Sequence, residues 1–139
     1  MTDSPSLQPA IPAAATLAQL PDAVVYSDCE GKILLWNAAA ERLFGFSAAE
    51  TIGQSLDIMI PERLRHAHWV GFDRAIAAGK VFHEGEVRLT RAIHKDGRKL
   101  YVDIAFGLGT AADGSVLGVV ATARPGEPPQ RPAAAPAPA

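Results

Sequence analysis

The amino-acid sequence predicts an α+β domain in which a five-stranded antiparallel sheet is flanked by short helices and one longer helix. Two short β-type runs come first and are joined by the turn-rich stretch "DCEG". An amphipathic stretch in the middle of the chain carries helix signals at both of its ends. Three β-type runs follow, and the Asp-Gly pair in "KDGR" joins the first two of them as a hairpin.

The first elements are expected to be a hairpin and two short helices. The hairpin strands are residues 23–27 and 32–36. Asn37 can cap a helix through "AAAERLFG", and Gly45 is a natural end for it. In "SAAE", at residues 47–50, a Ser and a Glu stand three residues apart, which is a capping-box signature. The chain is expected to turn again around "GQSLDIMI".

The longer helix is expected at residues 61–78, with proline in its first turn and Gly79 after its last. At 3.6 residues per turn, one stripe of this helix faces the core, and His66 lies off that stripe. The helix therefore turns His68 inward and leaves His66 at the surface. The inward stripe consists of Leu64, His68, Gly71, Phe72, Ala75 and Ile76.

The last three strands are expected at residues 84–94, 99–108 and 115–123. In the first of these, alternation separates two sets of side chains. One face holds Glu86, Arg88, Thr90 and Ala92, and the other holds Val87, Leu89, Arg91 and Ile93. Because the second set is the more apolar, the pattern by itself favours that face for the core and leaves Arg88 in water.

Length and composition indicate one globular domain with two flanking segments. The chain has 139 residues, of which 48% are hydrophobic and 20% are charged. Residues 1–16 and 125–139 are rich in Pro and Ala without periodicity, so both are expected to be disordered. The folded domain is expected at residues 17–124.

Charge, hydropathy and motifs exclude several classes of function. The formal net charge is −2 without a dense Lys and Arg block, so no nucleic-acid partner is expected. No apolar run approaches the roughly 18 residues of a membrane span, so we expect a cytoplasmic protein without a membrane partner. Cys29 is the only cysteine, which excludes an internal disulfide and a cysteine-cluster metal site. No phosphate-binding loop, zinc-protease motif or nucleophile elbow is present, and we expect no enzyme.

Three stretches together resemble a PAS domain, over about residues 17–124. They are "LPDAVVYSDCEGKILLWNAAAERLFGFSAAETIGQSL", the long helix, and "HKDGRKLYVDIAFGL" running into "DGSVLGVVATAR". PAS domains are sensory and dimerising modules whose sheet cups a small molecule or cofactor against the helices. The resemblance therefore implies the PAS fold, a role in signal transduction and a homodimer.

Within this family, "PERLRHAHWVGF" resembles the haem-binding FixL-type oxygen sensors. In that subgroup a histidine seven residues after the opening proline is the axial ligand of haem iron, and His68 has this place. An arginine eight residues before the Asp of the hairpin can hydrogen-bond bound oxygen there, and Arg88 has that place. The resemblance implies haem b as the cofactor and a wider set of contacts. These are Ile104 and Phe106 as walls on the gas side, and Gly71 and Phe72 on the His68 face of the helix.

The chain departs from the subgroup at three positions. Val87 stands where the usual Gly-x-Gly-Arg has its second glycine, and Trp69 follows the histidine in place of an Asp. Glu86 stands where some haem sensors have a methionine as the opposing ligand, so ligation by a Met/His pair of that kind is not expected.

Two functions remain open on the sequence. The first is a haem-binding sensor that detects O2, CO or NO through His68 and signals to an effector, in trans or in sequence outside this chain. The arginine favours oxygen, because bound oxygen carries partial negative charge. The second is a cofactor-free dimerisation or protein-interaction module in which His68 is a core residue with a hydrogen-bond partner. His83 is an alternative second axial ligand for the first function.

Overall fold

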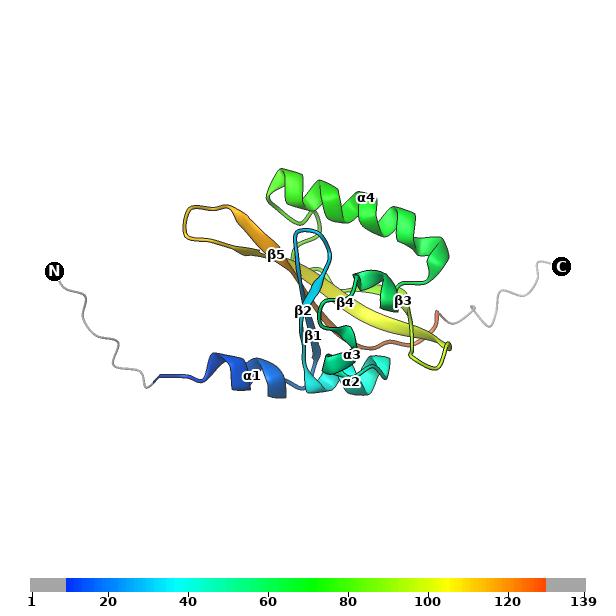
Figure 1. Ribbon diagram of the computed structural model, residues 1–139. Helices are drawn as coiled ribbons and strands as arrows, with labels where there is room; N and C mark the ends of the chain where they lie inside the picture. The colour runs from blue at the N-terminus through cyan, green and yellow to red at the C-terminus, as the bar shows by residue number, and fades with distance from the viewer. Residues whose placement is uncertain (1–9, 130–139) are drawn as a thin grey trace.

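The structure is a computed structural model that describes residues 10–129 (Figure 1). Its five strands form one antiparallel sheet in the order β2-β1-β5-β4-β3. The α+β fold with a five-stranded antiparallel sheet is thereby confirmed. The helices are α1 (Ala13–Gln19), α2 (Ala38–Phe44), α3 (Ala48–Thr51), the 3₁₀ helix η1 (Leu56–Met59) and α4 (Glu62–Ala78). The strands are β1 (Ala23–Asp28), β2 (Ile33–Trp36), β3 (Arg88–Ile93), β4 (Lys99–Thr110) and β5 (Val116–Pro125).

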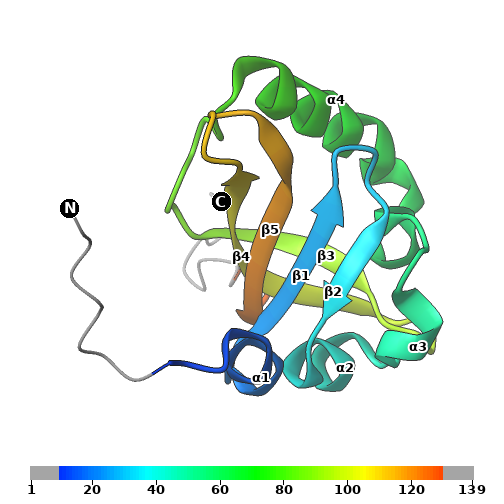
Figure 2. The ribbon, with the colours of Figure 1, turned by 60° about the vertical axis from the view of Figure 1, so that its left-hand side comes forward.

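The hydrophobic core lies between one face of the sheet and the helices α2, η1 and α4. Figures 1 and 2 show α4 beside the turn between β1 and β2, and α2 near the opposite end of these strands. Ile33, Phe44 and Val102 are the largest apolar side chains with almost no exposed surface. Since they come from β2, α2 and β4, the core joins both halves of the chain. Among the described residues, no helix is both long and apolar enough to cross a membrane.

The helix caps expected from the sequence are present. Asn37 Oδ1 accepts the backbone N–H of Ala40 at the start of α2. Ser47 and Glu50 form the reciprocal capping box of α3. Gly45 follows α2 in the left-handed conformation, at φ +84°, which a side chain would disfavour. These short-range interactions set the ends of the two short helices.

Helix α1 corrects the expected start of the ordered part of the chain. It begins at Ala13, so residues 13–16 are helical where the sequence predicted disorder. The amide of Asn37 donates to the carbonyl groups of Leu17 and Asp22, which ties the end of α1 to the start of α2. At the other end, β5 reaches Pro125, one residue past the predicted boundary. The rest of the expected disorder at residues 1–9 and 130–139 lies outside the described residues.

The predicted strand at residues 84–94 is wrong in its first part, because β3 begins only at Arg88. Gly85 has a φ of +75°, and the N–H of Glu86 donates to the carbonyl of His83. The chain therefore turns before it joins the sheet. Val87 lies outside the ladder and is 63% exposed.

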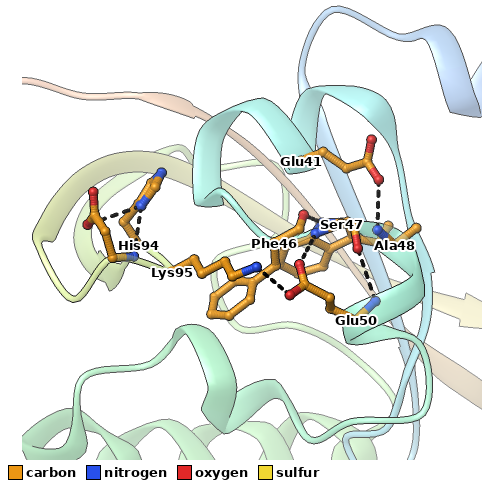
Figure 3. A network of polar contacts seen from close by, with 9 residues as sticks. Glu41, Phe46, Ser47, Ala48, Glu50, His94 and Lys95 are labelled. Atoms are coloured by element: carbon orange, nitrogen blue, oxygen red, sulfur yellow. Dashed lines mark hydrogen bonds and ion pairs between the residues drawn. The ribbon is translucent and has the colours of Figure 1, made fainter.

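The hairpin between β3 and β4 contacts the end of α2, the glycine that follows it and α3 (Figure 3). The backbone N–H of Lys95 donates to the carbonyl of Phe44, and its ammonium pairs with Glu50. The ring of His94 lies against Gly45, so closely that a Cβ on this glycine would be 2.4 Å from a ring carbon. The cap of α3 and the hairpin thus share Glu50 as a contact.

Candidate ligand-binding cavity

A cavity of about 620 Å³ lies between α4, η1, the segment that follows α4 and the inner face of the sheet. This volume is in the range of pockets that hold small molecules and cofactors. The apolar lining consists of Val25, Leu56, Met59, Ala67, Gly71, Phe72, Ala75, Val81, Phe82, Phe106, Val119 and Ala121. The polar lining consists of Ser27, His68, Arg74, His83, Glu86 and Arg88. An apolar cavity with a few polar groups is typical of a site for a small molecule or cofactor.

His68 borders this cavity from α4, and its Nδ1 atom is buried without a hydrogen-bond partner. Buried polar atoms are normally paired, so the structure does not provide the partner that a plain core histidine would have. Burial lowers the pKa of the imidazole below its usual value, although the carboxylates of Asp57 and Asp73 act in the opposite direction. Burial thus favours the neutral imidazole, which is the form that binds metal ions.

Arg88 is the first residue of β3, and it lies on the inner face of the sheet at the cavity wall. It shares this face with Ala92, which is buried, whereas Leu89 on the other face is 42% exposed. The interpretation that placed Val87 and Leu89 in the core is therefore wrong. On the inner face of β3, the small side chain of Ala92 belongs to the hydrophobic core.

The structure brings five of the six expected site residues to the cavity. Gly71 and Phe72 line it from α4, and Phe106 lines it from β4, together with His68 and Arg88. Ile104 is the exception: it belongs to the hydrophobic core and is absent from the cavity wall. It lies on the same face of the sheet as Phe106 but two residues earlier in β4.

In the part of the wall that follows α4, sequence reasoning named His83 and Glu86 but missed Val81 and Phe82. Phe82 lies there with the guanidinium of Arg74 at 4.6 Å and the ammonium of Lys80 at 5.6 Å from its ring. His83 Nδ1 is 3.2 Å from a carboxylate oxygen of Glu86. The apolar pair Val81-Phe82 was a weak signal for these two residues, because the segment has no periodicity that would show which side faces the cavity.

Comparison with known proteins identifies the family. A family model described as the PAS fold matches residues 14–126. The chain belongs to the PAS family. PAS domains are sensory and interaction modules and are generally not enzymes. The PAS domain of a Colwellia psychrerythraea protein superposes with a TM-score of 0.70 at 23% identity, covering 81% of this chain and 92% of that domain.

Two relatives are sensors by name, and one of them is named as an oxygen sensor. The sensor protein FixL of Bradyrhizobium diazoefficiens is 34% identical over 93 residues, which is 66% of this chain and 18% of the relative. The oxygen sensor protein DosP of Escherichia coli is 34% identical over 85 residues, which is 61% of this chain and 10% of the relative. The similarity to FixL expected from the sequence is confirmed, and this PAS domain matches only a small part of each relative.

Proposed function

We propose that this PAS domain binds haem b through His68 and senses a diatomic gas. The observation that carries the proposal is the position of His68, whose imidazole borders the apolar cavity while its buried Nδ1 has no partner. The named relatives, a sensor and an oxygen sensor, support the same function. So does the resemblance of "PERLRHAHWVGF" to the haem-binding FixL-type subgroup.

The residues around the cavity fit a haem. A flat macrocycle needs an apolar slot, which Gly71, Phe72 and Phe106 help to form. Its propionates need cationic partners at the edge, and Arg74 and Arg88 are both at the wall. When bound through His68, haem would supply an iron atom able to bind a diatomic gas.

Metal binding here would depend on the macrocycle rather than on a cluster of side chains. Within residues 10–129, His, Cys, Asp and Glu side chains do not gather in groups of three that could hold a metal ion. One histidine from the protein is enough to hold haem iron, because the nitrogen atoms of the macrocycle also bind the iron. The role of His68 would then be to present a ring nitrogen to the iron from α4.

Arg88 would select among gases. Its guanidinium always carries charge and presents several N–H donors. A gas molecule that accepts negative charge, such as oxygen, gains a charge-assisted hydrogen bond from it, and carbon monoxide gains much less. The aromatic rings of Phe72 and Phe106 would keep water away from this contact.

The sensor must pass its state to another molecule or domain. We propose a homodimer that signals to an effector, in trans or in sequence outside this chain, from the cytoplasm. The surface offers apolar side chains for such contacts, since Val87, Leu89 and Leu117 are all more than 40% exposed. The same exposure favours the second candidate, a cofactor-free interaction module.

The absorption spectrum of the purified chain with added haemin tests the proposal, in ferric, ferrous and carbon-monoxide forms. We expect a stoichiometric Soret band in the wild type that is lost or grossly altered in His68→Ala. His66→Ala is the matched control, because this exposed histidine lies two residues away on the same helix. If the wild type and His68→Ala take up haemin equally weakly, the haem proposal fails and the interaction module is favoured.

A further inference from the structure

Trp69 occupies the position next to His68 and is held by two contacts to other elements. Its indole Nε1–H donates to Oδ1 of Asp57 in η1 at 2.8 Å. Its ring lies on Gly31 in the turn between β1 and β2, where a Cβ would be 2.2 Å from a ring carbon. Both views show this turn beside α4 (Figures 1 and 2). A side chain at Gly31 and the indole ring therefore exclude each other.

Asp57 is itself fixed. Its backbone N–H donates to the hydroxyl of Ser55, which caps η1. The guanidinium of Arg65 donates to the carbonyl of Asp57 at 3.2 Å and to that of Ile60 at 3.1 Å. Two residues of α4, Arg65 and Trp69, thus hold the same short helix. Arg65 and Trp69 lie one turn of α4 apart. Together they restrain the distance of α4 from η1 and the rotation of α4 about its own axis.

These contacts add to a limited apolar packing of α4, in which Leu64, Trp69 and Ile76 are partly buried against the core. Only Phe72 and Ala75 of its 17 residues are buried. His68 also lacks the hydrogen bond that normally fixes a metal-binding imidazole. What remains around its ring are aromatic contacts, edge-on with Trp69 at 4.6 Å and tilted with Phe72 at 5.8 Å between centroids. The orientation of His68 therefore depends on where Trp69 is held.

We propose that Trp69 and Asp57 form a positioning pair that holds His68 toward the cavity in place of a direct hydrogen bond to its imidazole. This inference rests on the proposed function of His68 and names what orients it. Trp69 stands where the FixL-type subgroup has an Asp, so the pair is a feature of this chain.

Haemin release tests the pair. Asp57→Ala removes the acceptor, Trp69→Phe removes the donor and keeps a ring, and Asp57→Asn keeps an acceptor oxygen. We expect the first two to speed transfer of haemin to excess apomyoglobin about tenfold, the scale of effects from partners of metal ligands. Both should also shift or broaden the iron–histidine band in the resonance Raman spectrum of the ferrous protein. Asp57→Asn should restore both readouts toward the wild type.

Asp73→Ala is the matched control for charge. The carboxylates of Asp73 and Asp57 both oppose the lowering of the His68 pKa by burial. Asp73, however, is exposed on α4, and the indole of Trp69 donates to Asp57 and not to Asp73. If Asp73→Ala releases haemin as fast as Asp57→Ala, charge rather than positioning explains the effect and the inference is overturned. Unchanged release from Asp57→Ala and Trp69→Phe overturns it as well.

A second readout needs no haem. In the apoprotein, NMR should show slow solvent exchange of the Trp69 indole N–H and one narrow set of His68 ring signals. Asp57→Ala should accelerate the exchange and broaden the ring signals, with circular dichroism confirming a retained fold. If the wild type takes up no haemin but this difference is observed, the proposed function fails while the positioning stands. Identical signals in wild type and Asp57→Ala overturn the positioning itself.

Discussion

Arg88 on β3 and Ile104 on β4 are direct partners across the sheet, and only Arg88 borders the cavity. Ile104 is 7% exposed and packs in the core, whereas Arg88 is exposed at its edge. The two therefore mark the point where the inner face of the sheet changes from core to cavity wall. Substitutions on the two sides of this boundary should have different effects.

Ile104→Ala should lower stability and leave the ligand site largely intact. Removing a buried isoleucine side chain costs about 2 to 4 kcal/mol in the free energy of unfolding, measured by urea denaturation. The spectrum of the haem-loaded variant should match that of the wild type. Phe106→Ala is the comparison, because this residue lines the cavity, and it should speed carbon monoxide binding. A changed haem spectrum in Ile104→Ala would place this residue at the ligand after all.

Arg88→Ala should weaken oxygen binding by the haem-loaded protein far more than carbon monoxide binding. A hydrogen bond from a charged donor contributes about 1.5 to 3 kcal/mol, so the oxygen dissociation rate should rise about ten- to hundredfold. Stopped-flow measurement of both gases gives the ratio. Arg91→Ala is the control, since Arg91 lies on the same strand with its guanidinium 5.9 Å from the ring of Tyr101. Equal effects on the two gases would mean that Arg88 acts through cavity shape and not through hydrogen bonding.

Gly45→Ala should destabilise the fold through two separable effects. The left-handed backbone at φ +84° strains any side chain, and the added Cβ would also collide with the ring of His94. Gly53 has a similar φ of +89° but open space around a Cβ, so Gly53→Ala reports the strain alone. We expect strain of about 1 kcal/mol at Gly53 and a larger loss at Gly45, measured as free energies of unfolding. Equal losses would show that the His94 ring moves away without cost.

The features that sequence could predict are those fixed by nearby residues. The caps at Asn37 and Ser47 and the glycine that ends α4 depend on contacts within one helical turn, so a single sequence displays them. The inward direction of His68 follows from helix geometry in the same way. The family resemblance supplied the cavity position of Arg88, whereas alternation by itself favoured water.

What sequence could not predict depends on contacts between distant segments. Alternation separated Arg88 from Leu89 correctly, but the more apolar face that it favoured for the core is the outer one, where Leu89 is exposed. Leu89 packs over the chain after β5, where a Cβ on Gly126 would be 2.7 Å from its side chain. The bond between Trp69 and Asp57 spans two elements, and no local signal in either predicts it.

Acid should weaken the contact between the β3–β4 hairpin and α3. The ammonium of Lys95 is the main reason that the pKa of Glu50 is held below its usual value, followed by the backbone N–H of Ser47. Because this pKa is lower in the folded chain, Glu50 contributes stability that is complete above its unfolded value of 4.5 and is lost as pH falls through the folded value. Urea unfolding of wild type and Glu50→Gln should therefore differ at neutral pH and converge as the pH falls from 4.5 through the lower folded pKa of Glu50. Glu30→Gln, at an exposed carboxylate in the β1–β2 turn, should show no such convergence. A gap between wild type and Glu50→Gln that stays constant with pH would show that the carboxylate charge does not hold the hairpin.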